Sequence, residues 1–272
     1  MPVGTWRCRY LKMAARVGGY TTEHWRDLQY AAAVIGTVLC TSLRPRYWTR
    51  TRWHLFARQV RAIGVEPIGF VFALAVFVGF SVVVQLSFWT GEAGQSQLLG
   101  PLLVAVVARE LGPVLINLVV IVRSGSAMTT ALGVLKVSGE VRALEAQGQE
   151  PFRQLVVPRV LGVAVSTICL TIVFILAAFA SGYLFAAWLG KGNRDLFLFA
   201  DTVSSAVQPK DIFNILAKTI LPALFTSASC CLGGLGIGRS GAEIPPATQR
   251  ALTRSVAGLI VISAIVSLLT YL

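Results

Sequence analysis

Two adjacent charged residues interrupt an apolar stretch of this sequence. Arg109 and Glu110 lie within residues 98–122, where every other residue is uncharged. A charge at the centre of a bilayer costs about 2.5–3.5 kcal/mol on insertion scales, so such residues are normally paired and face the protein interior. Pro113 follows closely and cannot donate a backbone hydrogen bond to the preceding helical turn. These residue types predict a polar site at Arg109, Glu110 and Pro113 inside an apolar region.

This polar site has two interpretations, and the residues leave both open. It lines a cavity that takes a substrate, or it is a structural link that joins helices inside the apolar region. Adjacent residues point about 100° apart on a helix of 3.6 residues per turn, so Arg109 and Glu110 are not expected simply to bridge each other. We expect Glu110 to pair with another helix or with a second copy of the chain, or to line a polar pocket.

The remaining reactive residues argue against other kinds of site. The only histidines, His24 and His54, lie in the basic N-terminal segment, which excludes a histidine-based active site in the apolar part of the chain. The five cysteines show neither a disulfide framework nor the spacing of a metal site, and no metal is expected. The apolar stretches contain no nucleophile–base pair, so a membrane-embedded enzyme ranks last. The glycine-rich run 233–238 follows an apolar stretch and indicates close helix packing rather than a nucleotide turn.

The elements that hold the polar site are predicted to be transmembrane helices. The chain has 272 residues, of which 55% are hydrophobic and 13% charged, whereas soluble domains carry roughly 25% charged residues. A helix needs about 20 apolar residues to cross a bilayer. We therefore predict an all-α integral membrane protein with one transmembrane domain, 66–272, whose spans cover about 67–90, 98–122, 160–189, 214–236 and 252–271. Lys218, just inside the fourth span, is expected to snorkel to the outer interface.

The distribution of charge predicts the orientation of these spans. The formal net charge is +12, and residues 1–61 contribute +9 of it, from 11 basic and 2 acidic residues. Basic residues also concentrate in the loops 123–159 and 239–254, which lie on the same side as the N-terminus if there are five spans. Because basic loops remain cytoplasmic, we expect a cytoplasmic N-terminus and a periplasmic C-terminus. The basic excess therefore indicates topology, and no nucleic acid partner is expected.

The N-terminal arm, residues 1–65, is predicted to contain helices at the membrane surface. The segment 47–64 places Trp53 and Phe56 on one helical face and Arg58 and Arg61 elsewhere, a pattern typical of a helix in the headgroup plane. The alternatives are a basic helix docked on a partner protein or an arginine-rich contact with nucleic acid. The shorter apolar run 28–43 is flanked by arginines. We interpret it as a helix at or near the membrane surface rather than a sixth span.

The loop 123–159 is predicted to contain a short cytoplasmic helix over about 138–148. Ser138 is a candidate N-cap, Gly148 a candidate end, and Pro151 prevents continuation. A short helix held between two spans is suited to be pushed by a cytoplasmic partner. The alternative is an ordinary solvated loop helix, and the residues alone do not decide between the two.

Several runs of this sequence together form a specific pattern. They are Val107-Ala-Arg-Glu-Leu-Gly-Pro-Val-Leu, Arg123-Ser-Gly-Ser-Ala, Val141-Arg-Ala-Leu-Glu and Pro151-Phe-Arg-Gln-Leu-Val-Val-Pro-Arg-Val-Leu, with a weaker match at Gly241-Ala-Glu and Ala247-Thr-Gln-Arg-Ala. With these runs the chain resembles the MlaE/YrbE-type permeases, the membrane subunits of ABC transporters that move phospholipids or related lipids with MCE-domain proteins. The resemblance covers about residues 47–272, and two positions depart from the usual family pattern: Ala131 and Gly139 each stand where family members usually carry a glutamate.

The resemblance implies a homodimeric permease in the bacterial inner membrane, with two cytoplasmic ABC ATPase subunits and a periplasmic MCE-domain partner. A phospholipid would enter a cavity near Arg109 and Glu110. The sequence lacks the phosphate loop Gly-x-x-x-x-Gly-Lys-Ser/Thr, so the chain is expected to hold no cofactor, and ATP would be bound and hydrolysed by the partner. The 138–148 helix would be the coupling helix that contacts the ATPase, through Glu140, Val141, Arg142, Leu144 and Glu145.

A second class of transporter remains as the alternative. An ion- or proton-coupled carrier would use Arg109 and Glu110 as a relay and would need no ATPase. Against it, the sequence shows no evident inverted repeat and few other charges within the spans. A co-purifying ATPase would separate the two classes.

Overall fold

The computed structural model of the chain describes residues 33–38, 40–42, 50–92, 99–188, 205, 208–238 and 240–271. Every regular element in these ranges is helical, and most of the predicted basic arm lies outside them. In chain order the named elements are α2 (Arg50–Val60), η2 (Arg61–Val65), α3 (Ile68–Glu92), α4 (Leu99–Leu103), η4 (Val104–Leu111), α5 (Gly112–Val120), η5 (Ile121–Gly125), α6 (Ser126–Val137), α7 (Glu140–Ala146), η6 (Phe152–Val156), α8 (Val157–Trp188), α10 (Pro209–Leu235), η7 (Gly241–Glu243) and α11 (Ile244–Tyr271).

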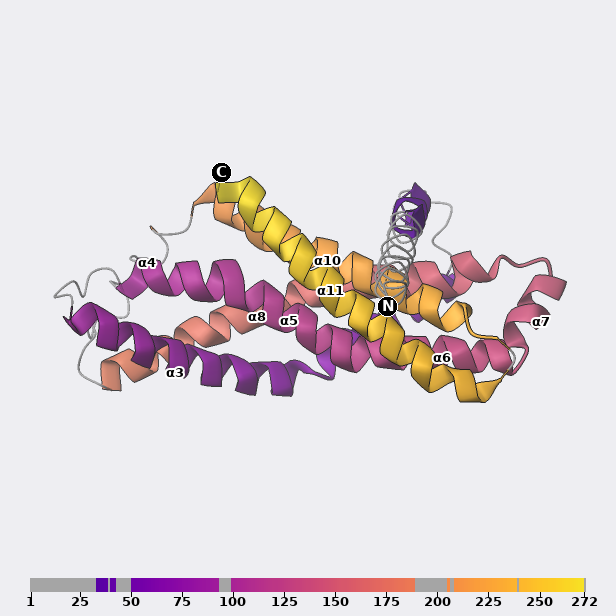
Figure 1. The fold of residues 1–272 in the computed structure, drawn as a ribbon, viewed down its shortest axis with the longest axis horizontal. Coiled ribbons are helices and arrows are strands. Elements are labelled where there is room, and N and C mark those ends of the chain that lie inside the picture. The colour runs from indigo at the N-terminus through magenta and orange to yellow at the C-terminus, as the bar shows by residue number, and fades with distance from the viewer. Residues whose placement is uncertain are drawn as a thin grey trace, which may run out of the picture.

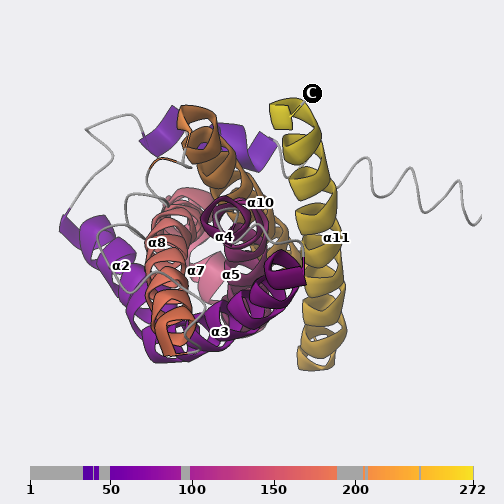
Figure 2. The same ribbon diagram turned by 90° about the vertical axis from the view of Figure 1, so that its left-hand side faces the viewer.

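Five helical stretches in the described part of the chain are long and apolar enough to cross a membrane, which confirms the predicted all-α membrane architecture. They form an elongated bundle in which α3 and α8 pack side by side and α11 crosses α5 and α6 obliquely (Figure 1). Viewed from the α4 end, α11 stands at the edge of the bundle beside α10 (Figure 2). The stretches are Arg52–Leu86, Pro101–Val137, Phe152–Phe185, Pro209–Leu235 and Gly241–Thr270.

The second of these stretches is longer than the predicted span 98–122. It runs without a break through Val137 and changes twice into wider π-helical turns, at η4 and η5. Arg123, where the apolar sequence ends, does not end the helix, because η5 and α6 continue the helical backbone to Val137. Within this part the Ser126 hydroxyl also donates a hydrogen bond to the carbonyl of Val122 at 2.7 Å. π-Helical turns often mark functional positions, and η4 contains both Arg109 and Glu110.

The predicted short helix is present as α7, inside the expected range 138–148, and it lies at the end of the bundle opposite α4 (Figure 1). The prediction that Ser138 caps it was wrong. Ser138 instead closes α6 and donates its hydroxyl to the carbonyl of Leu135 at 3.2 Å. Gly139 makes the turn between the helices with φ of 84°, a left-handed conformation that favours glycine. Gly148, with φ of 71°, ends the segment as predicted.

Small residues let the spans approach closely. A Cβ atom on Gly79 of α3 would lie 2.4 Å from the carbonyl oxygen of Ala178 on α8, so only glycine fits there. In the glycine-rich run, a Cβ on Gly234 would lie 2.7 Å from the side chain of Leu132, and one on Gly233 would lie 3.0 Å from Ala251. These contacts confirm that the run serves helix packing.

The segment that precedes the predicted span 67–90 is helical as α2 and η2. A turn at Glu66 and Pro67 joins it to α3, so the first long stretch of the structure already begins at Arg52. Trp53 is 56% exposed and its ring lies 5.6 Å from that of Phe56. Arg58 and Arg61 are also exposed, whereas Ile63, on the inward side of η2, is only 3% exposed. The membrane-interface role of these residues stays a prediction, as does the division into two domains. Residues 33–38 and 40–42 are helical, and Val38 there is buried.

Candidate functional site

Arg109 forms an ion pair with a residue about a hundred positions further along the chain. Its Nη2 atom lies 2.9 Å from Oδ2 of Asp211, which is 1% exposed in the first turn of α10. The same carboxylate accepts a hydrogen bond from the backbone N–H of Gln208 at 2.9 Å, which forms part of a capping box. Asp211 therefore both starts α10 and neutralises Arg109.

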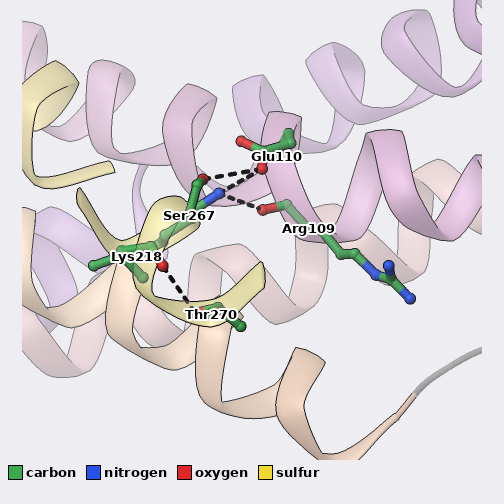
Figure 3. Close-up of polar contacts among 6 residues, drawn as sticks. Arg109, Glu110, Lys218, Ser267 and Thr270 are labelled. Atoms are coloured by element: carbon green, nitrogen blue, oxygen red, sulfur yellow. Dashed lines mark hydrogen bonds and ion pairs between the residues drawn. The ribbon is translucent and has the colours of Figure 1, made fainter. Parts of the chain in front are cut away.

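Glu110 points in a different direction from Arg109 and meets two other helices. Its Oε1 atom accepts hydrogen bonds from Nζ of Lys218 on α10 at 2.6 Å and from Oγ of Ser267 on α11 at 3.2 Å (Figure 3). Lys218 is fully buried, whereas Glu110 is 50% exposed. Arg109, Glu110, Asp211 and Lys218 are here called the four-charge cluster. It contains two positive and two negative charges, which pair across helices rather than between neighbours in sequence.

Two prolines release backbone carbonyls that side chains of the facing helix then bind. Pro113 has no N–H to offer the carbonyl of Arg109, and Nζ of Lys218 donates to that oxygen at 3.2 Å. Pro222 likewise leaves the carbonyl of Lys218 without its helical donor, and Nδ2 of Asn117 donates to it at 3.2 Å. Asn117 also donates to the carbonyl of Pro113 at 2.8 Å. Each of the two proline-containing helices thus supplies a side-chain donor for a backbone carbonyl of the other.

Asn117→Leu is expected to destabilise the fold by about 1–3 kcal/mol, the cost of leaving a buried polar group unsatisfied. The same substitution in a Pro222→Ala background should cost less, because alanine, unlike proline, supplies the backbone N–H that the Lys218 carbonyl lacks. Equilibrium unfolding of the four purified proteins measures both values. Equal losses in the two backgrounds would contradict this assignment of the Asn117 side chain.

The sequence-based interpretation missed three members of this site and misplaced one. Lys218 does not snorkel to an interface, because its ammonium is buried between Glu110 and the Arg109 carbonyl. Asp211, Asn117 and Ser267 were not predicted to take part. One signal was available: Asp211 and Lys218 are seven residues apart, two helical turns, so they share a helical face.

The arrangement explains how charges are held in an apolar bundle, and it also leaves one of them accessible. Asp211 and Lys218 are buried, so their role is to hold α10 against η4. Glu110 is half-exposed beside α11, whose outer side chains are apolar and exposed. The geometry therefore supports the structural interpretation for Asp211 and Lys218, whereas a substrate-binding role of Glu110 stays a prediction. The exposed residues on this part of α11 are Ile260, Val261, Ile265, Leu268 and Leu269.

At the opposite end of the bundle, α7 presents polar side chains outward. Val141 is buried and Leu144 is half-buried, whereas Glu140, Arg142 and Glu145 are exposed. The helix is therefore anchored by its apolar residues and displays charges of both signs on a surface that another protein can reach. This surface and the four-charge cluster are connected by the continuous helix that runs from α4 to α6.

Known proteins resemble this chain over most of its length. Residues 56–269 match the family model described as Permease MlaE. The intermembrane phospholipid transport system permease protein MlaE of Haemophilus influenzae is 25% identical over 231 residues, which cover 84% of this chain and 87% of that protein. A probable ABC transporter permease protein of Rickettsia prowazekii is 25% identical over 247 residues, covering 90% and 92% of the two chains.

A plant protein is similar as well. Protein TRIGALACTOSYLDIACYLGLYCEROL 1, chloroplastic, of Arabidopsis thaliana is 25% identical over 246 residues, which cover 89% of this chain and 67% of that protein. The family match covers η4, α7 and α10, so it includes both the four-charge cluster and the polar surface of α7. This all-helical integral membrane protein belongs to the MlaE permease family.

Proposed function

We propose that this chain is the permease subunit of an ABC-type complex that transports phospholipids or related lipids between membranes. A separate cytoplasmic ATPase would drive the cycle, and a periplasmic MCE-domain protein would receive or deliver the lipid. The observation that carries the proposal is the family match over residues 56–269, together with a relative whose name is an intermembrane phospholipid transport permease. The protein would lie in the bacterial inner membrane with α7 on the cytoplasmic side.

The geometry of the four-charge cluster supports a lipid substrate. Half-exposed Glu110 lies beside the exposed apolar side chains of α11. A polar headgroup and an acyl chain need this combination: a charged group next to a continuous apolar surface. Little of α11 is covered by the rest of the protein. In the stretch Gly241–Thr270 only 22% of the most apolar 18-residue segment is buried, against 56% of the corresponding segment in Pro209–Leu235. A second copy of the chain facing α11 would enclose a cavity between two such surfaces.

The polar face of α7 supports an ATPase partner. Its exposed charges of both signs, Glu140, Arg142 and Glu145, are carried by a helix anchored through Val141. Force applied to this helix would pass through Gly139 into α6, which belongs to the same continuous helix as Arg109 and Glu110. ATP-driven movement at α7 would in this way reach the proposed substrate site.

Co-purification tests the proposed function. The intact permease should be extracted from native membranes in mild detergent, and its partners and retained lipids identified by mass spectrometry. We expect an ATPase with a phosphate loop and bound phospholipid. Transport that depends on an ion gradient, without any ATPase, would instead establish the carrier.

Glu110→Gln is expected to reduce lipid transport by about tenfold while the complex still assembles. Glutamine keeps the size of glutamate and can accept the hydrogen bonds of Lys218 and Ser267, but it loses the charge, and a charge-assisted hydrogen bond contributes about 1.5–3 kcal/mol. Lipid transfer between labelled vesicles measures the loss, and gel filtration checks assembly. Glu150→Gln is the control, because Glu150 is exposed at the other end of the bundle. Unchanged transport in Glu110→Gln would remove Glu110 from the substrate site.

A further inference from the structure

A pocket lined by both charged and apolar residues lies at a different level of the bundle from the four-charge cluster. It has a volume of about 260 Å³ and is formed where η2, the η5–α6 segment and the start of α8 meet. Arg123 lies 14 residues after Arg109 on one continuous helix, about 20 Å away at a rise of 1.5 Å per residue. The pocket is therefore a separate site, and its existence does not depend on the proposed transport function.

Three charged residues line this pocket, and each stands at the end of an apolar stretch. Glu66 directly precedes the predicted span 67–90, Arg123 directly follows 98–122, and Arg159 directly precedes 160–189. Apolar stretches of this kind end where the hydrocarbon gives way to lipid headgroups. The structure brings the three span ends together around one hollow, so the pocket lies at headgroup level.

The charges in the pocket do not cancel. Arg123 pairs with Glu66 at 3.5 Å, and both side chains are exposed. Arg159 adds a second positive charge, and its buried Nη1 atom has no hydrogen-bond partner among the described residues. A buried N–H of a guanidinium without an acceptor is costly, and a bound anion would satisfy it. The pocket therefore carries a net charge of +1 and a donor that faces no acceptor.

The walls of the pocket combine fixed polar groups with apolar ones. Gln59 lies close against α8 at Gly162, where a Cβ would be only 2.9 Å from the Gln59 Cγ atom. Ser166 of α8 also donates to the carbonyl of Val60 at 3.4 Å, which keeps this wall in place. Buried Ile63 and Met128 supply the apolar surface. Donors over an apolar base suit a phosphate ester better than a fully hydrated ion.

We propose that this pocket binds the phosphate of a phospholipid headgroup, held by Arg159 and Arg123. Guanidinium groups bind phosphate oxygens through paired N–H donors. The volume is slightly below the range of about 300–1,000 Å³ typical of ligand pockets, so the pocket takes a headgroup while the acyl chains stay in the bilayer. Free inorganic phosphate presents the same chemistry, but the position at three span ends favours the lipid.

Ala131 provides a sharp test, because it lines the pocket, is exposed and carries no charge. Ala131→Glu would place a carboxylate beside the two arginines and compete with the phosphate. Ala131→Gln adds the same bulk without charge. The full-length protein is reconstituted in nanodiscs of phosphatidylcholine with a minority of phosphatidylglycerol, and lipids that it retains on release are counted by native mass spectrometry. We expect about tenfold less retained phosphatidylglycerol in Ala131→Glu, and retention near the unmodified level in Ala131→Gln.

Arg159→Gln should lower retention to a similar extent, whereas Arg153→Gln should not, since Arg153 pairs with Glu150 outside this pocket. If Arg159→Gln fails to fold, the comparison of Ala131→Glu with Ala131→Gln still tests the proposal, because residue 131 is exposed. Added inorganic phosphate distinguishes the two sources of the ligand: loss of lipid at low phosphate concentration would show a site for the free ion and overturn the lipid assignment. Retention that is equal in Ala131→Glu and Ala131→Gln would overturn the site altogether.

Discussion

Lys218→Met is expected to destabilise the folded protein by about 3–5 kcal/mol, the usual cost of removing one partner of a buried ion pair. The substitution leaves Glu110 without its cation at 2.6 Å and the carbonyl of Arg109 without the side-chain donor at 3.2 Å. Because Glu110 is half-exposed, water can compensate part of the loss, so a value near the lower end is expected. Equilibrium unfolding in mixed micelles, followed by circular dichroism, measures it.

A matched variant and a double variant make this result interpretable. Lys210 is an exposed lysine in the first turn of the same helix, so Lys210→Met should leave stability nearly unchanged. Combining Lys218→Met with Glu110→Gln removes both charges of the pair, and the double variant should recover part of the stability because no unpaired carboxylate remains. If Lys218→Met is as stable as Lys210→Met, the cluster does not hold α10 in place.

Glu145→Lys is expected to weaken association with the ATPase by tenfold or more. Glu145 is exposed on α7, and reversing a charge in a protein interface replaces an attractive contact with a like-charge contact, which costs several kcal/mol. The fold should be unaffected, because residue 145 is exposed. A pull-down of the ATPase with tagged permease, at several salt concentrations, measures the change.

Glu150→Lys is the control for this experiment, since Glu150 is also exposed and lies just beyond α7. If both reversals weaken association equally, the effect is one of overall charge and α7 is not the docking helix. If the ATPase binds Glu145→Lys as well as it binds the unmodified protein, the proposed coupling role is wrong.

The five spans could be predicted because the bilayer demands about 20 apolar residues of each crossing helix. Their ends could not be predicted equally well. Hydropathy reports where lipid ends, whereas a helix ends only where its backbone hydrogen bonds stop. The second span illustrates the difference: the apolar sequence stops at Val122, and the helix continues to Val137 because no residue before Gly139 forces the backbone out of helical geometry.

The short helix at 138–148 shows the same distinction on a smaller scale. Gly148 and Pro151 were reliable signals of its end, because glycine and proline act through their own backbone. Ser138 was not a reliable signal of its start. A serine hydroxyl caps a helix only if the serine occupies the N-cap position. Here Gly139, in a left-handed conformation, occupies that position, and Ser138 belongs to the end of the preceding helix.

For the polar site, the sequence alone determined that charges occur inside an apolar stretch and that Pro113 frees a backbone carbonyl beside them. Both facts are local, since they depend only on residue types and helical geometry. The tertiary structure decided which residues compensate them. Asp211 and Lys218 lie about a hundred residues from Arg109 and Glu110, and they became partners because α10 packs along η4 and α5. Pairing at that separation depends on which helices meet and at which rotation, and side-chain packing of the whole bundle sets both.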